Sequence, residues 1–356
     1  MSQKTPETQP DQAQPKEPEL PAPPKKGDGE QAGPYQNAQM DLFQRFICNT
    51  PLERERLSNT IDIWDSTPRY SISQQEMNKR RDERGNLPLL VRHFSYRGQE
   101  YAVEIQAAKI REGDKVVDYY PSANEELVEE ALRKIAVRQS QGFFEKTPLR
   151  SGVAFSLYEL RQEMAAMGHT RSYRQLVQSL NILRKSHIEL RRLDAKGEVV
   201  VASNYLQGMA AVSRGLLDED PEARWVVQFH PLVARGIDQL AYRQIDYATL
   251  MALPTQLARW LHKQLTIKFT FASMFGNPFE MRYSTIKRDS HLLNRGRERD
   301  NRRDVDEALA ELVKSEVLRE VQRREVIEGK GRVVDVIYYL HPTQEFVKGM
   351  KAANKR

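Results

Sequence analysis

The fold is decided by residues 180–188, which read Leu-Asn-Ile-Leu-Arg-Lys-Ser-His-Ile, and by residues 309–317, which read Leu-Ala-Glu-Leu-Val-Lys-Ser-Glu-Val. Two leucines, a lysine, a serine and a final β-branched residue recur at a constant offset of 129 residues. Short Leu-x-x-Leu matches also arise by chance in helical proteins, so the flanking sequence must decide whether this is an internal repeat.

The flanks of the two stretches repeat in the same order. Each stretch is preceded by a short strand and helix, over 155–167 and 281–293, and by a polar turn. Each is followed by an extended run, a glycine turn and a second extended run, over 188–206 and 317–340. Helix, turn, helix and hairpin is the order of a winged helix, whose second helix can enter a DNA major groove.

The sequence therefore predicts an α+β protein with two tandem winged-helix domains, at residues 87–235 and 238–345. We expect residues 207–250 to link the domains. Residues 241–271 are expected to form the opening helix of the second domain, because apolar residues recur there at helical spacing. Winged helices also serve in protein–protein contacts, so the distribution of charged residues must show whether these domains bind DNA or protein.

Composition narrows the class of protein. The chain has 55 basic against 49 acidic residues and a pI near 9.2, which favours a polyanionic partner. No apolar run reaches the roughly 18 residues of a membrane helix, and the N-terminus lacks the apolar core of a secretory signal. Cys48 is the only cysteine, which suits a reducing compartment. We expect a cytoplasmic protein with no membrane partner.

The N-terminal segment differs from the rest of the chain. Its first 34 residues hold 8 of the 18 prolines and a single large aliphatic residue, Leu20. Such a segment cannot bury enough apolar surface to offset the entropy of ordering it. We therefore predict a disordered tail over residues 1–38. The tail is acidic overall, so the basic character belongs to the folded part.

Arginines are dense in the turn and at the start of the second helix of the second copy, where residues 287–303 carry a net charge of +4. The guanidinium group suits phosphate and the O6/N7 edge of guanine, and an asparagine amide suits adenine. A solvated charge run is the ordinary alternative, but the place before a recognition helix favours DNA contact. The predicted DNA-binding residues of this copy are Lys287, Arg288, Arg295, Arg297, Arg299, Asn301, Arg302 and Arg303, with Lys330 and Arg332 at the hairpin tip.

The first copy has a less basic second helix. Thr170 is expected to be its N-cap, so that Arg171 and Gln175 lie in the first turn, where free N–H groups favour phosphate. We expect this copy to contact the DNA backbone, to mediate self-association, or both. Its predicted DNA-binding residues are Arg171, Tyr173, Arg174, Gln175, Gln178 and Lys185.

An apolar island follows the predicted tail at residues 39–47. It begins Gln39-Met40-Asp41-Leu42-Phe43, and one explanation is the first turn of a core helix. The other is a linear motif, since it is similar to the peptide by which bacterial replication proteins bind the DNA polymerase sliding clamp. In that case Leu42 and Phe43 would fill an apolar pocket, and the Gln39 amide would hydrogen-bond at its rim.

No catalytic or cofactor-binding motif is present. The chain has no Gly-x-x-x-x-Gly-Lys-Ser/Thr loop for nucleotide phosphates, and its seven histidines lack metal-binding spacing. The tyrosine pairs 119–120 and 338–339 lack the histidine pair that a nicking enzyme uses, so we interpret them as strand residues. We expect a protein that is not an enzyme and uses no cofactor or metal.

With these features together, the chain resembles the plasmid replication initiators that bind iterons, most closely the TrfA type. The resemblance is most specific at 39–43 and at residues 155–160, Phe-Ser-Leu-Tyr-Glu-Leu. It implies a DNA-binding initiator, associated with a plasmid in a bacterium, that binds direct repeats at the origin and opens the adjacent DNA. The implied partners are the host sliding clamp, the host replicative helicase and initiator, and a second copy in a monomer–dimer equilibrium. Met40 and Asp41 depart from the more usual Leu and Ser.

Two other functions fit the same domains. A winged-helix transcriptional repressor would bind DNA but would have no use for residues 39–43. A non-catalytic scaffold would bind DNA without sequence preference, or would not bind it.

Overall fold

The computed structural model describes residues 56–138, 152–194, 199–212, 224–238, 242–268, 278–329 and 331–353. The predicted tail (1–38), the predicted motif (39–47) and Lys330 lie outside these ranges. The described residues all belong to one compact unit of mixed helices and strands. The α+β class is confirmed, and all the strand pairs in the described residues are antiparallel.

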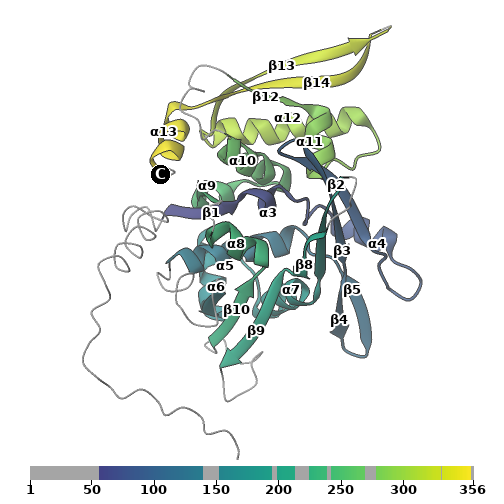
Figure 1. The fold of residues 1–356 in the computed structure, drawn as a ribbon, viewed down its shortest axis with the longest axis vertical. Helices are drawn as coiled ribbons and strands as arrows, with labels where there is room; N and C mark the ends of the chain where they lie inside the picture. Colours follow the sequence, from purple (N-terminus) through teal and green to yellow (C-terminus); the bar gives the residue numbers. More distant parts are fainter. Residues whose placement is uncertain are drawn as a thin grey trace, which may run out of the picture. The chain divides into compact units, whose positions relative to one another are not determined.

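The first half of the chain begins with a strand and two helices, continues with four strands, and reaches the first copy of the repeat after a long helix (Figure 1). Before the repeat lie β1 (Leu57–Ile61), α3 (Asp62–Ser66), α4 (Gln74–Arg80), β2 (Leu90–Tyr96), β3 (Gln99–Gln106), β4 (Ala108–Glu112), β5 (Lys115–Tyr119) and α5 (Ala123–Arg138). The first copy comprises β6 (Gly152–Ser156), α6 (Leu157–Ala166), α7 (Tyr173–Lys185), β7 (His187–Arg192) and β8 (Val199–Asn204).

The second half contains the second copy in the same order. Between the copies lie β9 (Leu206–Val212), β10 (Arg224–Phe229), α8 (Pro231–Asp238), β11 (Tyr242–Asp246), α9 (Tyr247–Ala252) and α10 (Gln256–Lys268). The second copy comprises β12 (Phe279–Arg282), α11 (Tyr283–Ser290), α12 (Glu298–Lys314), β13 (Leu318–Glu328) and β14 (Arg332–Pro342), followed by α13 (Gln344–Ala353). The sheets have the strand orders β2-β3-β7-β8, β6-β10-β9 and β12-β14-β13, with the pairs β1-β11 and β4-β5.

The matched leucines of the two copies have the same structural role. Leu180 and Leu183 of α7 are fully buried in a first hydrophobic cluster, which extends along the chain to Met251. Leu309 and Leu312 of α12 are buried in a second cluster, which begins at Leu253. In each copy a helix on a 3.6-residue period thus packs its leucine face under a hairpin.

The start of α7 differs from the prediction. Ser172, not Thr170, is the N-cap: its hydroxyl accepts from the Gln175 N–H at 3.3 Å, and the Gln175 side chain accepts from the Ser172 N–H at 2.9 Å. This reciprocal capping box satisfies two N–H groups at once, which a threonine two residues earlier could not do. Arg171 therefore precedes the helix.

The predicted opening helix over 241–271 is also corrected, as is the predicted linker over 207–250. Tyr242–Asp246 is a strand that pairs with β1, and Pro254 separates α9 from α10. Trp225, Val227 and Phe229 of β10 are buried in the first cluster, so the described part of this region belongs to the core. The apolar residues at 257–265 do lie on a helix, α10. The prediction extended this helix backwards over β11 and α9, because β11 is short and α9 follows it directly.

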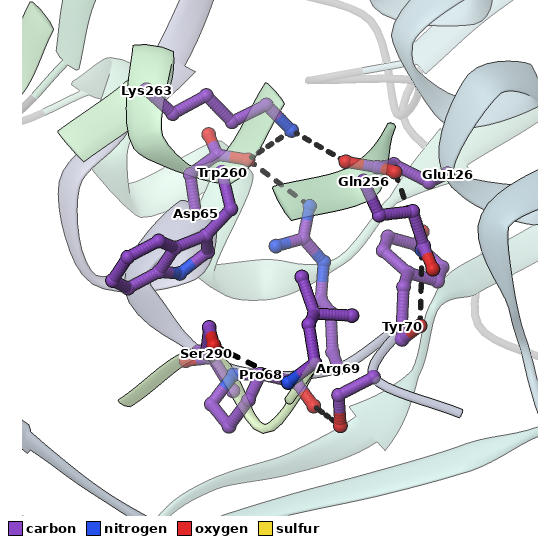
Figure 2. A pocket seen from close by; sticks show the side chains of 12 residues that line it. Asp65, Pro68, Arg69, Tyr70, Glu126, Gln256, Trp260, Lys263 and Ser290 are labelled. Atoms are coloured by element: carbon purple, nitrogen blue, oxygen red, sulfur yellow. Dashed lines mark hydrogen bonds and ion pairs between the residues drawn. The ribbon is translucent and has the colours of Figure 1, made fainter. Parts of the chain in front are cut away.

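Buried charges meet where α10 lies against α5 and α3, and Figure 2 shows three of them, Asp65, Glu126 and Lys263. Lys263 of α10 bonds Glu130 of α5 at 2.7 Å, and Arg259 of α10 bonds Glu126 of α5 at 2.9 Å. Asp65 of α3 accepts from Arg133 of α5 at 2.9 Å. Each of these side chains is at most 8% exposed, so these ion pairs are desolvated.

Candidate nucleic-acid interface

The first turn of α12 presents exposed arginines. Arg297 is the N-cap residue, and Arg299 and Arg303 lie on the first two turns of the helix, all three of them exposed. None of the described acidic side chains forms an ion pair with Arg297 or Arg299. Arg303 has only long contacts, 3.6 Å to Asp300 and 3.7 Å to Glu307. These guanidinium groups are therefore available to a phosphate or to a base edge.

Asn301 has a different role from the one predicted. Its side chain is completely buried and lies against the backbone of Arg295. Asn301 Oδ1 accepts from the Arg295 N–H at 2.8 Å, and its Nδ2 donates to the Arg295 carbonyl at 3.1 Å. Both amide groups are thus engaged in closing the turn before α12. In this conformation Asn301 shapes the turn and cannot pair with adenine, which corrects the expectation from the sequence.

Other predicted cations already have acidic partners on the surface. Lys287 bonds Glu298, Arg288 bonds Asp289 at 2.7 Å and Arg295 bonds Asp304 at 2.9 Å. The hydrogen bond to Asp304 raises the pKa of the Arg295 guanidinium above its ordinary value. Exposed pairs of this kind contribute little to stability, so phosphate can compete for the cations.

The turn before α12 is fixed by contacts with the first half of the chain. Asp289 accepts from the Ser95 N–H of β2 at 3.0 Å, and the His291 ring lies 2.7 Å from the His93 carbonyl. Asn294 donates to Glu76 of α4 at 3.2 Å. His291 has a positive φ of 54°, a left-handed conformation in which non-glycine residues are uncommon. Sequence patterns did not indicate these residues, because their partners lie about two hundred positions away.

The β13–β14 hairpin, which we call the wing, is attached to the same helix. Arg302 donates to the Val333 carbonyl at 3.3 Å, and Asp306 accepts from Arg323 at 2.8 Å and from the Tyr338 hydroxyl at 3.0 Å. Arg332 is exposed at the start of β14. These contacts tie the wing to α12. Figure 1 shows the hairpin alongside α12.

The equivalent helix of the first copy, α7, is covered on its outer face. Ile182 packs against Ala108 and Ile110 of β4, in a small apolar cluster of its own. On the same face Gln178 donates to Glu112 at 3.1 Å, and Lys185 donates to the Lys109 carbonyl at 3.3 Å. The β4–β5 hairpin thus lies where DNA would lie against a recognition helix.

The matching face of α12 is open. At the 129-residue offset, Gln178, Ile182 and Lys185 correspond to Glu307, Glu311 and Lys314. The side chains of Glu307 and Lys314 are 69% and 77% exposed. An isoleucine in one copy against a glutamate in the other is the sequence signal that distinguishes the covered helix from the open one. The structure therefore argues against base contact by Gln178 and Lys185.

The N-terminal end of α7 is only partly engaged. Arg171 bonds the Asn124 side chain at 2.5 Å, and Tyr173 lies under the guanidinium of Arg161 at 5.1 Å. Gln175 completes the capping box, while Arg174 is exposed. Arg174 matches Arg303 of α12 at the repeat offset. Of the residues predicted in the first copy, Arg174 is the one that presents its charge most openly.

The described ranges offer no metal site and no membrane-spanning helix. No group of three or more His, Cys, Asp and Glu side chains there is arranged to hold a metal ion. No helix of the described part has the length and apolarity to cross a bilayer. Tyr119, Tyr338 and Tyr339 are strand residues as expected, while Tyr120 follows β5 and its hydroxyl bonds the Pro88 carbonyl.

No family model and no curated protein matches this sequence. Solved structures are similar to it. A selenomethionine form of domains 2 and 3 of RctB has 11% identity and a TM-score of 0.47, covering 73% of this chain and 93% of that one. A second structure of RctB domains 2–3 has 11% identity and a TM-score of 0.45, covering 76% and 97%. The Pi initiator protein in complex with iteron DNA has 14% identity and a TM-score of 0.42, covering 62% and 94%.

The Pi protein is an initiator in complex with iteron DNA, the class of protein that the sequence resembles. What this chain can bind follows from its own residues.

Proposed function

We propose that this chain is a sequence-specific double-stranded DNA-binding protein that initiates plasmid replication by binding iterons at the origin. In this proposal residues 87–235 and 238–345 are two winged-helix domains, α12 is the helix that contacts bases, and β13–β14 is its wing. The observation that carries the proposal is the group of exposed arginines on the first turns of α12, the second helix of a helix-turn-helix-hairpin unit.

The chemistry of that helix suits a major groove. In helix-turn-helix proteins the N-terminal residues of the second helix contact base edges. Arg299 and Arg303 lie on these turns and can reach guanine in bidentate geometry, while the helix N-terminus favours a nearby phosphate. The later turns carry Glu307 and Glu311, which would be repelled by phosphate. The basic end of α12 is therefore the part that enters the groove.

The two copies divide the work. The outer face of α7 is covered by β4–β5, so the first copy would contact the DNA backbone near Arg174 instead of inserting its helix. At the repeat offset α12 also begins four residues earlier than α7, and this extra turn contains Arg299. Base contacts would therefore come mainly from the second copy, with phosphate contacts supplying much of the affinity. Self-association of the first copy stays part of the proposal.

The proposal is tested with the full chain on DNA that it selects from a random duplex pool. We expect Arg299→Ala and Arg303→Ala each to weaken binding to the selected site by about 1–3 kcal/mol, the range for a bidentate base contact. Lys314→Ala removes an exposed cation from the opposite end of the same helix and is the matched control, with little effect expected. Arg174→Ala should weaken binding to all sequences alike and lower the salt dependence by about one phosphate contact.

Two results would overturn the base-contact assignment. One is a failure of the pool to converge on any sequence, which would favour a scaffold. The other is an equal loss of affinity from Lys314→Ala and Arg299→Ala. That result would mean that affinity depends on net positive charge and not on contacts with particular bases.

A transcriptional repressor would use the same DNA interface, so a different part of the chain must separate the two functions. We propose that residues 39–43 bind the host sliding clamp. Saturable binding of the full chain to a bacterial clamp, lost in the variant Leu42→Ala/Phe43→Ala, would support an initiator. Equal behaviour of the variant and the native chain would leave the repressor as the better explanation. Contacts with the host helicase and initiator are proposed on the sequence resemblance alone.

A further inference from the structure

The free end of the wing carries an exposed apolar side chain where a hairpin turn is ordinarily polar. Ile327 is 59% exposed, and Val334 on the other strand is 42% exposed. Strand β12 pairs with β14 only from Ile337 to Leu340, so the wing beyond that point consists of two strands (Figure 1). The apolar side chains thus lie on a narrow projection.

From Glu320 to Val326 the wing keeps a regular register, and the register changes at Ile327. Arg323 pairs with Tyr338, Glu325 with Val336 and Ile327 with Val333. Paired residues share a face, so the row of Arg323 and Glu325 lies on the side of the fully buried Val336 and Tyr338. The register shifts between Val326 and Ile327, as in a β-bulge. A bulge increases the local twist and re-aims side chains.

Two contacts hold this projection beside the arginines of α12. The Arg302 guanidinium donates to the Val333 carbonyl at 3.3 Å. Asp335 accepts from the Ser284 N–H at 3.0 Å and from its hydroxyl at 2.7 Å. Ile327 lies across the hairpin from Val333, about 5 Å away by the spacing of paired strands. Because Arg302 of α12 bonds Val333, Ile327 is separated from α12 by one strand.

The charge around Ile327 favours DNA as its partner. Arg324 and Arg332 are both exposed, and neither has an acidic partner among the described side chains. The acidic Glu325 is already bonded to Arg323 at 2.6 Å. Glu328, which follows Ile327, is exposed too and lies opposite Arg332. An exposed apolar side chain with an unpaired arginine on each strand of the hairpin suits a narrow groove edged by phosphates better than it suits an apolar protein surface.

We propose that Ile327 is a minor-groove wedge. With the basic end of α12 in the major groove, the wing reaches the adjacent minor groove, and Ile327 enters one base step, partly unstacks it and bends the duplex toward the major groove. This inference rests on the proposed DNA binding. Unstacking costs a few kcal/mol per step and least at flexible pyrimidine–purine steps, so the wedge would prefer sites with such a step beside the α12 contact.

The test uses the full chain and a duplex selected from a random pool, carrying 2-aminopurine at each step next to the α12 footprint. Fluorescence should rise at one step on binding, and energy transfer between dyes on the two duplex ends should report a bend. Ile327→Ala should abolish most of the fluorescence rise and straighten the duplex while lowering affinity by no more than about tenfold, because the avoided unstacking cost offsets lost contacts. Ile327→Leu should retain both signals.

Val116→Ala is the matched control, since Val116 is a 54% exposed apolar residue on the β4–β5 hairpin. It should change neither signal. Bending and fluorescence that persist in Ile327→Ala would overturn the proposal, as would native protein that binds without unstacking any step. If Ile327→Ala loses self-association but still bends the duplex, Ile327 contacts a second copy of the chain and not the DNA. If the native chain selects no DNA, the proposed function itself fails, which is a separate outcome.

Discussion

Replacing Lys263 by methionine should destabilise the protein far more than any exposed lysine would. Its ammonium group lies 2.7 Å from Glu130, 3.5 Å from Glu126 and 3.5 Å from Asp65, with the side chain 5% exposed. Burial lowers the pKa of Lys263, but the three carboxylates raise it further, so that the net pKa lies above its ordinary value. The group is therefore charged at neutral pH, and its ion pairs outweigh its desolvation.

The size of the effect follows from what the change leaves behind. Methionine fills much the same space, so little cavity forms, but the buried acids lose one of their balancing charges. Breaking a buried pair by removing one partner costs about 3–5 kcal/mol, because the remaining charge is uncompensated. We expect Lys263→Met to lower the free energy of unfolding by that amount. The double variant Lys263→Met/Glu130→Leu removes both charges and should recover part of the loss.

Urea unfolding of the full chain, followed by tryptophan fluorescence, measures these changes by linear extrapolation. Lys314→Met is the matched control, because that side chain is 77% exposed and its distance to Glu311 is 3.6 Å. Its effect should stay within about 0.5 kcal/mol. A loss below about 1 kcal/mol in Lys263→Met would refute the reasoning, since it would mean that water reaches these ion pairs. A double variant worse than the sum of its singles would refute it as well.

Three further outcomes follow from single contacts. Asn301→Ala should lower stability by about 1–3 kcal/mol and weaken DNA binding, measured by thermal unfolding and gel shift, because the Arg295 N–H and carbonyl lose their partner in the turn before α12. Ile182→Glu, which introduces the residue found at the matching position of α12, should release the β4–β5 hairpin, seen as faster amide exchange in β4. Burial lowers the pKa of His262 to about 4 from 6.5, so the unfolded chain alone gains this proton as the pH falls from 6.5 to 4. Stability should fall over that window by about 3 kcal/mol, in urea titrations against pH, and His262→Gln should remove this slope.

The repeat and its elements were predictable because they rest on local signals. A helical period of leucines, glycines at the hairpin turn and β-branched residues in the strands all act within about ten residues. The structure accordingly places α12, β13 and β14 close to the predicted positions. The basic turn before α12 was also evident, since charge density is a property of composition.

The stretch from 57 to 72 was not predictable in the same way. It has polar and charged residues that suggest a surface, yet Asp65 and Arg69 are almost fully buried. Arg69 bonds Asp65 at 3.1 Å and Glu129 of α5 at 3.1 Å. A charge can be buried only where opposite charges from other elements meet it, and no local pattern shows which elements those are.

Local patterns along the chain establish the repeated unit, its leucine-packed helices and the place of its arginines, since periodicity and charge density are local properties. Only the tertiary structure decided which copy is open. The α7 face is closed by a hairpin some seventy residues earlier in the chain, through Ile182, whereas Glu311 at the matching position of α12 stays at the surface. Exposure is set by what packs against a helix, and that contact depends on the path of the whole chain.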